Sequence, residues 1–175
     1  MTAAVTAETA AQTPVLQRVL RPYLPHCRYL RSATVDTGAA ALRVVGELAI
    51  PASCYIEDTG HFNSVEFNIC FNQLGYYAMA KAVDEGLVDP YARWSLDGYF
   101  DRQLGNILIA DLRSSFRRPM NARAFHGEVV FERIIDRRSI VVNKTRCRFW
   151  DDGTGESEGE VTVVITDPPA GEAQR

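Results

Sequence analysis

The sequence has little of several features that would place a protein in a specialised class. Lys and Arg number 19 against 22 Asp and Glu, which gives a formal net charge of -3. The chain therefore lacks the basic excess that nucleic-acid binding requires. No apolar run approaches the roughly 18 residues of a membrane-spanning helix, so we expect no membrane partner. The remaining mixture, 46% hydrophobic and 23% charged residues over 175 positions, is typical of one globular domain with a sizeable core.

Residues that bind metals or form disulfides are also scarce. Four cysteines (Cys27, Cys54, Cys70 and Cys147) form no C-x-x-C pair, and the three histidines complete no zinc-type cluster. Free thiols in a reducing compartment are the simplest account. Residues 1–13 are rich in Ala and Thr and lack the basic start and apolar middle of a secretion signal. We therefore expect a cytoplasmic protein with no bound metal or cofactor.

Apolar periodicity divides the chain into elements. A short amphipathic helix is predicted from Val15 to Leu20, and alternation predicts a strand from Leu42 to Ile50. Residues 64–83 are apolar around most of the circumference of a helix, which predicts a buried one. Residues 90–99 look irregular. Further strands are predicted at 106–116, 125–135, 139–150 and 160–166, with polar turns at 117–123, 136–138 and 151–159.

A long helix that is apolar nearly all round needs a sheet curled around it to cover its faces. The strands follow one another as hairpins, which favours antiparallel pairing. The pattern therefore predicts an α+β fold with one long buried helix and an antiparallel sheet. We expect one domain over residues 15–166, with a flexible N-terminal tail at 1–14 and a loose C-terminal tail at 167–175.

A loop rich in turn formers, residues 55–63, leads directly into the predicted buried helix. A helix N-terminus offers unpaired backbone N–H groups and a partial positive charge. Gly60 allows a backbone to approach a ligand closely. We expect this turn to hold an oxygen that becomes negative during a reaction, as an oxyanion hole does. Asn63 and Glu66 also have the spacing of a capping box, in which both would only stabilise the helix, and the pattern leaves the two roles open.

Other polar residues of this region have two interpretations each. His61 is a candidate general base because an imidazole accepts a proton near neutral pH. Glu66 competes with it, since burial would favour a protonated carboxyl that can exchange a proton. Asn72, on an otherwise apolar helix, either satisfies a buried neighbour or orients a reactant.

Four arginines form a basic cluster in a net acidic chain: Arg113, Arg117, Arg118 and Arg123. They would steer an acidic partner toward the site, or one of them would clamp a carboxylate bidentately. Ordinary solvated surface charge is the plain alternative.

The segment 55–74, YIEDTGHFNSVEFNICFNQL, strongly resembles the FcoT-like family. Its members are the type III fatty acyl-CoA thioesterases, also described as (2E)-enoyl-ACP glycyltransferases of isonitrile lipopeptide biosynthesis. The resemblance extends over roughly residues 16–164. Its shared segments are 18–23, 27–30, 55, 59–63, 65–66, 70–74, 116–121 and 149–151.

The resemblance implies a hot-dog fold, in which an antiparallel sheet wraps a central helix, and a homodimer or higher homo-oligomer. It implies a fatty acyl thioester carried on the phosphopantetheine of an acyl-carrier protein, or on coenzyme A. The implied reaction is addition of the glycine amine to the β-carbon of a (2E)-enoyl thioester, with release of a 3-(carboxymethylamino) fatty acid. One alternative is a long-chain fatty acyl-CoA thioesterase that activates a water. A second is a non-catalytic acyl-thioester-binding protein.

The resemblance also places active-site side chains at Tyr23, Tyr55, Asn63 and Asn72. A tyrosine hydroxyl can donate to a carbonyl or return a proton to an enolate carbon. The predicted catalytic set is Tyr23, Tyr55, His61, Asn63, Glu66 and Asn72. The predicted substrate-binding residues are Gly60, Phe62 and Arg117.

Overall fold

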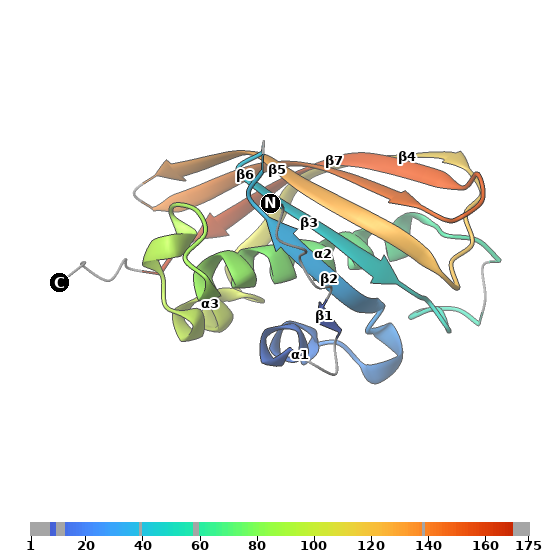
Figure 1. Ribbon diagram of the computed structural model, residues 1–175, viewed down its shortest axis with the longest axis horizontal. Helices are drawn as coiled ribbons and strands as arrows, with labels where there is room; N and C mark the ends of the chain where they lie inside the picture. Colours follow the sequence, from blue (N-terminus) through green and yellow to red (C-terminus); the bar gives the residue numbers. More distant parts are fainter. Residues whose placement is uncertain (1–7, 10–12, 39, 58–59, 138, 170–175) are drawn as a thin grey trace, which may run out of the picture.

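A long helix lies against one face of an antiparallel sheet in the computed structural model, which describes residues 8–9, 13–38, 40–57, 60–137 and 139–169 (Figure 1). The helix is α2 (Ser64–Asp84). The sheet has the order β1-β2-β3-β5-β6-β7-β4, and every neighbouring pair is antiparallel. The strands are β1 (Glu8–Thr9), β2 (Leu30–Asp36), β3 (Leu42–Leu48), β4 (Ile107–Arg118), β5 (Phe125–Arg137), β6 (Ile140–Trp150) and β7 (Glu156–Thr166). This is the predicted α+β layout of a helix wrapped by a sheet.

The helix α2 is buried on most of its circumference, as its apolar pattern predicts. Its N-cap is Asn63, whose side-chain oxygen accepts hydrogen bonds from the backbone N–H groups of Val65 and Glu66 at 2.9 and 3.3 Å. Its C-terminal end is followed by Gly86, whose φ of 61° is the left-handed conformation that glycine adopts readily. The predicted range of 64–83 is confirmed and is extended by one residue.

Glycines on the inner face of the sheet allow the sheet to lie close to α2. A Cβ added at Gly127 would lie 2.8 Å from Leu74 Cδ1 and 2.7 Å from Phe149 Cε1. At Gly159 it would lie 2.7 Å from Phe67 Cζ. Large side chains of the helix thus fill the space that these strand positions leave open, which places the helix N-terminal half deep in the curve of the sheet.

A buried amide fastens the segment before β2 to the helix. Gln73 on α2 is fully buried, and its oxygen accepts hydrogen bonds from the backbone N–H groups of Tyr29 and Leu30, each at 2.9 Å. Its nitrogen donates to the Cys27 carbonyl at 2.7 Å. Gln73, within the segment 70–74, therefore has a structural role.

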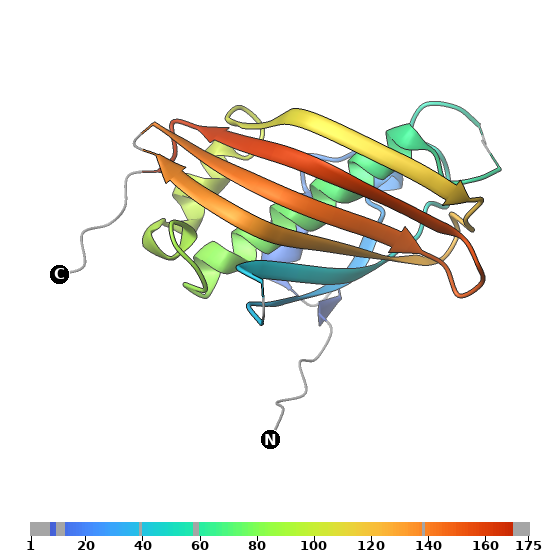
Figure 2. The same cartoon turned by 90° about the horizontal axis from the view of Figure 1, so that it is seen from above.

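The remaining helical elements lie around α2 (Figure 2). They are α1 (Pro14–Leu20), the 3-10 turns Pro25–Cys27 and Tyr91–Arg93, and α3 (Leu96–Arg102). The predicted short helix at Val15–Leu20 is confirmed. Residues 90–99 were predicted to be irregular with at most a short turn of helix, and α3 begins within them. Tyr99 holds α3 in place, since its side chain is buried and its hydroxyl donates to the Tyr76 carbonyl at 2.9 Å.

Residues 30–36 form β2, a strand that the mixed polarity of this stretch does not predict; pairing along β3 supplies the hydrogen bonds. The predicted turn 151–159 is too long, since β7 begins at Glu156. The acidic, glycine-containing sequence 156–159 looks like a turn, but Ser157 and Gly159 face inward where bulky rings leave room only for small residues.

Most of the predicted tails lie outside the described residues, at 1–7, 10–12 and 170–175. Glu8–Thr9 pair with β2. None of the helices in the described part of the chain is long and apolar enough to cross a membrane.

Candidate active site

Two cavities flank the turn that leads into α2, and His61 lines both. The first, named here the small cavity, has a volume of about 110 Å³. It is lined by Ile50, Pro51, Ala52, Ser53, Glu57, Gly60, His61, Glu66, Asn121, Ala122 and Arg123. The second, named here the groove, has a volume of about 390 Å³. It is lined by His61, Phe62, Asn63, Ser64, Phe116, Arg117, Arg118, Pro119, Met120 and Ser157.

The small cavity is polar and carries charges of both signs. Glu66 is only 1% exposed, whereas Arg123 and Glu57 lie at its solvent-exposed side. The Ser53 hydroxyl is buried and has no hydrogen-bond partner among the described residues. Buried polar atoms are normally paired, so an unpaired hydroxyl at a cavity wall indicates a position where a polar ligand atom is accommodated.

The groove has an apolar floor and a basic rim. Phe62 is buried, with ring centroids 5.0 Å from Phe125 and 5.3 Å from Phe149. Phe116 on β4 is 43% exposed. The Ser157 hydroxyl is buried without a hydrogen-bond partner in the described part of the chain. The predicted substrate-binding residue Phe62 thus forms part of the wall of a groove suited to an apolar chain.

Asn63 and Glu66 form the capping arrangement that their spacing predicts. Beyond its helix-capping bonds, Asn63 donates from Nδ2 to Glu66 Oε2 at 3.1 Å. The carboxylate of Glu66 is therefore held in a fixed orientation at the small cavity. The N-cap role of Asn63 is confirmed, and Glu66 bonds back to the side chain of Asn63. A catalytic role for either residue remains a prediction.

The turn before the helix has the backbone that a close approach requires. Gly60 has a φ of 72°, which is strained for residues that carry a Cβ, and nothing lies within 4 Å of the position a Cβ would take. Open space beside this backbone, next to the N-terminus of α2, is consistent with the predicted oxygen-binding turn.

Three of the predicted catalytic residues lie apart from both cavities. Among the described residues, neither lining includes Tyr23, Tyr55 or Asn72. Asn72 is nine residues after Asn63, which is about 14 Å along a helix axis. Tyr55 is 51% exposed. Burial raises the pKa of the half-buried Tyr23 hydroxyl, and the nearby Tyr76 and Cys70 raise it further. Within one chain, His61, Asn63 and Glu66 therefore line the cavities. The other three predicted residues do not.

The predicted basic cluster is also divided. Arg117 forms an ion pair with Glu158, with Nε 3.1 Å from Oε1, and this hydrogen bond raises the Arg117 pKa. Arg118 lines the groove, and Arg123 donates to the Pro51 carbonyl beside the small cavity. The fourth arginine, Arg113, faces the opposite surface of the sheet.

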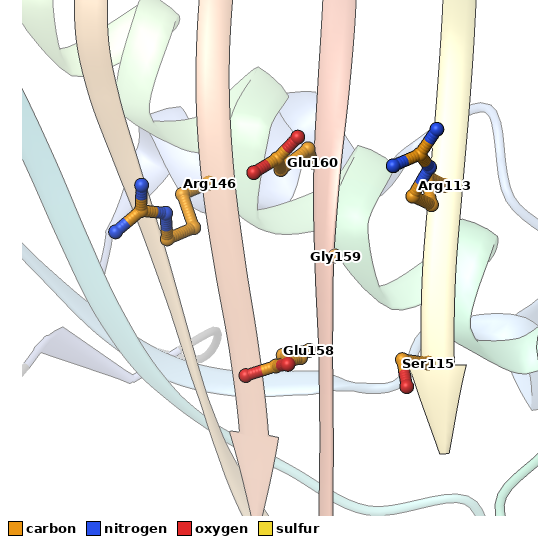
Figure 3. A pocket seen from close by; sticks show the side chains of 6 residues that line it. All are labelled: Arg113, Ser115, Arg146, Glu158, Gly159 and Glu160. Atoms are coloured by element: carbon orange, nitrogen blue, oxygen red, sulfur yellow. The ribbon is translucent and has the colours of Figure 1, made fainter.

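That opposite surface has a hollow of about 300 Å³ (Figure 3). It is lined by Arg113, Ser115, Arg146, Glu158, Gly159 and Glu160. The labelled side chains project from β4, β6 and β7 on the face turned away from α2. Two of the charged residues form ion pairs with residues outside the lining: Arg146 with Glu132 at 3.1 Å, and Glu158 with Arg117. The hollow lacks the buried, unpaired polar groups of the two cavities, so we do not select it as the site.

Ser53 and Ser157 are cavity residues that no sequence pattern predicts. Ser53 follows a strand-ending proline, and Ser157 was assigned to a turn. Only the tertiary structure shows that their hydroxyls are buried at cavity walls. No group of three or more His, Cys, Asp and Glu residues in the described ranges could hold a metal ion.

Comparison with known sequences identifies relatives along nearly the whole chain. The model of the FcoT-like thioesterase domain matches residues 18–165. A protein of Streptomyces coeruleorubidus named (2E)-enoyl-ACP glycyltransferase is 47% identical over 163 residues, which cover 89% of this chain and 97% of that protein. Proteins of the same name from Mycobacterium marinum and Mycobacterium tuberculosis are each 36% identical, covering 92% and 89% of this chain and 90% and 87% of their own.

Comparison with solved structures identifies the fold. A phenylacetic acid degradation-related protein of Ralstonia eutropha, described as a proposed thioesterase, has a TM-score of 0.50 at 18% identity and covers 86% of this chain and 99% of its own. A proposed thioesterase of Shewanella oneidensis has a TM-score of 0.52 at 14% identity, with coverages of 87% and 97%. The predicted hot-dog fold is thereby confirmed.

Proposed function

Because the chain belongs to the FcoT-like thioesterase family, we propose that it adds glycine to the β-carbon of a (2E)-enoyl thioester on an acyl-carrier protein and releases a 3-(carboxymethylamino) fatty acid. The observation that carries this proposal is the 47% identity to a (2E)-enoyl-ACP glycyltransferase over nearly the full length of both chains. The two adjacent cavities, one polar and one with an apolar floor, suit a reaction between a small polar molecule and an acyl chain.

The addition step assigns a task to each group around the turn. The nitrogen lone pair of neutral glycine forms a bond to the β-carbon, and the electrons of the double bond move to the thioester oxygen as an enolate. The turn at Gly60, with the N-terminus of α2, would stabilise that oxygen. A proton leaves the nitrogen for His61 or Glu66, and a proton is returned to the α-carbon. Water then adds to the thioester carbonyl, and cleavage of the C–S bond gives the free acid and the carrier thiol.

The groove would receive the acyl thioester. Phe62, Phe116 and Met120 offer apolar contact for the chain, and the exposed arginines Arg117 and Arg118 lie beside it. Acyl-carrier proteins are acidic and present a phosphopantetheine, so positive charge beside the groove would attract them. Coenzyme A carries the same arm and would enter in the same way.

A homodimer would complete this site. In the described structure, β4 pairs along one edge with β7 and is the outermost strand of the sheet (Figure 2). It is 12 residues long and exposes Leu108 and Phe116. Long exposed edges with apolar side chains favour pairing with another chain. A second copy along β4 would cover this edge beside the groove and would bring a second set of Tyr55 and Asn72 to the molecule.

Plain hydrolysis of a long-chain acyl-CoA is the second candidate, favoured by the description of the family model as a thioesterase domain. Binding without catalysis explains less, since an acyl-binding tunnel has no need of the buried Glu66 carboxylate and the Ser53 hydroxyl at a separate polar cavity.

Incubation with crotonyl-acyl-carrier protein, with and without glycine, tests the proposal. Products are followed by mass spectrometry. A glycine adduct that is later released from the carrier supports the proposed function. Free crotonate formed at the same rate with and without glycine supports the thioesterase instead. An unchanged substrate would contradict both enzymes.

A further inference from the structure

We infer that the small cavity is the binding site for glycine, with its carboxylate held by Arg123 and Ser53 and its amine directed toward Glu66 and His61. This inference rests on the proposed function and assigns each of its two substrates to one of the two cavities. The acyl thioester would occupy the groove, and the two reactants would meet at His61, which lines both.

The small cavity has room for a molecule of this size. Its volume is about 110 Å³, several times the roughly 10–15 Å³ that one water molecule needs. Glycine, with five non-hydrogen atoms, is comparable to that space, whereas a fatty acyl chain is far too long for it. The groove is more than three times larger and has the apolar floor that the small cavity lacks.

The charges of the small cavity complement a zwitterion. A guanidinium has N–H donors in a fork that matches a carboxylate, and the Arg123 guanidinium, which donates to the Pro51 carbonyl, lines this cavity. The Ser53 hydroxyl, buried without a partner among the described residues, adds a second donor in the same lining. We assign the glycine carboxylate to these two groups; the exposed Glu57 carboxylate lies on the solvent side of the cavity.

Glu66 supplies the negative charge that an ammonium group requires. Its carboxylate is almost completely buried and is oriented by the 3.1 Å hydrogen bond from Asn63. A buried carboxylate attracts an ammonium group and can accept a proton from it. An amine bound here would lie beside the turn and next to the groove, which is where the β-carbon of the enoyl chain must come.

The walls would discriminate against larger amino acids. Four of the lining residues are apolar and line the cavity on the β3 side and at the turn after β4: Ile50, Pro51, Ala52 and Ala122. A methyl group on the α-carbon of the amino acid would press against these residues. We therefore expect glycine to react faster than either enantiomer of alanine.

The test measures initial rates while glycine and crotonyl-acyl-carrier protein are varied separately. We expect Arg123→Gln and Ser53→Ala to raise the KM for glycine by about 10-fold or more, because each removes a hydrogen bond to a charged group. The KM for the carrier substrate should change less than about two-fold, since the groove is intact. Arg123→Lys, which keeps the charge without the fork, should lie between wild type and Arg123→Gln. Arg146→Gln on the opposite face of the sheet is the matched control and should leave both values unchanged.

Glycine binding can also be measured without turnover, by NMR titration. Ala122→Leu should fill the small cavity and abolish the chemical-shift changes that glycine causes in the wild-type protein, while crotonyl-acyl-carrier protein still binds. Melting temperatures of all variants establish that they are folded. An unchanged KM for glycine in Arg123→Gln and Ser53→Ala, or glycine binding that survives Ala122→Leu, would overturn the assignment while leaving the proposed function in place. A wild-type protein that forms no adduct yet binds glycine in this cavity would overturn the proposed function alone.

Discussion

At the scale of single residues, Asn63 connects folding with the proposed chemistry. Its side-chain oxygen caps α2, and its side-chain nitrogen fixes the carboxylate of Glu66. We propose that Asn63 contributes to the reaction through the position of Glu66, as a positioning residue.

Substitution can separate these two roles. Asn63→Ala should lower the free energy of unfolding by about 1 kcal/mol, because the helix loses its cap. Asn63→Ser keeps an oxygen acceptor and should be close to wild type in urea unfolding, yet its glycine addition should be slower because it cannot hold Glu66 in the same way. Wild-type turnover in Asn63→Ser would show that Asn63 acts only as a helix cap.

The second group of predicted residues requires its own test. We expect Tyr55→Phe and Asn72→Ala to lower turnover by at least about 100-fold, the size of a lost proton donor or orienting group. Tyr55 is half exposed and Asn72 half-buried on α2, so neither substitution should disturb the core. Circular dichroism and melting temperature check the fold, and near-normal rates in both variants would remove these residues from the site.

At the scale of elements, the contact between α2 and the sheet places the turn and both cavities. The strands β3, β5 and β7 carry Gly46, Gly127 and Gly159 where Leu74 and Phe67 of the helix come closest. The helix can approach because these positions have no side chain. A small shift of α2 would move Glu66 and the turn at Gly60 together, since both are joined to its first turn.

A single methyl group tests this contact. Gly127→Ala should lower the free energy of unfolding by about 1–3 kcal/mol, because the new Cβ overlaps Leu74 and Phe149 in a packed core. Gly105→Ala is the matched control, since nothing lies within 4 Å of its Cβ position, and it should be near neutral. Both are measured by urea unfolding. Equal free energies of unfolding of the two variants would show that the sheet can move away from α2 without loss of stability.

At the scale of the whole molecule, the exposed edge of β4 is the feature that one chain leaves incomplete. The residues beside it line the groove, and Tyr55 and Asn72 lie outside both cavities of the same chain. We propose that a second copy of the chain pairs along this edge, beside the groove, so that assembly and activity depend on each other.

Charge on the edge should oppose that assembly. We expect wild type to have the mass of a dimer or larger in light scattering, and Leu108→Lys to shift toward the 19.5 kDa monomer because a lysine on an edge strand disfavours pairing. Leu104→Lys changes another exposed leucine, which precedes β4 (66% exposed against 47% for Leu108), and should keep the wild-type mass. A monomeric wild type would contradict the proposed homodimer.

Local patterns in the sequence were sufficient for several parts of this protein. The uninterrupted apolar surface of residues 64–83 determines a buried helix, because such a surface is stable only when covered. The strand pattern of Leu42–Ile50 and the Asn63–Glu66 spacing are equally local; the strand appears two residues shorter, as Leu42–Leu48, and Asn63 caps the helix. The family resemblance predicted the hot-dog fold, and it placed predicted active-site residues around the turn before α2.

Tertiary structure alone decided the rest, because it depends on contacts between residues far apart in the chain. β2 is a strand through its pairing with β3, and residues 156–159 extend because rings from distant segments lie over them. The small cavity unites Ser53, Glu66 and Arg123 from three separate segments, and no periodicity records that they meet. The sequence by itself thus determined the helix and the fold class, and it predicted a location for the site, whereas folding determined which side chains surround each cavity and which do not.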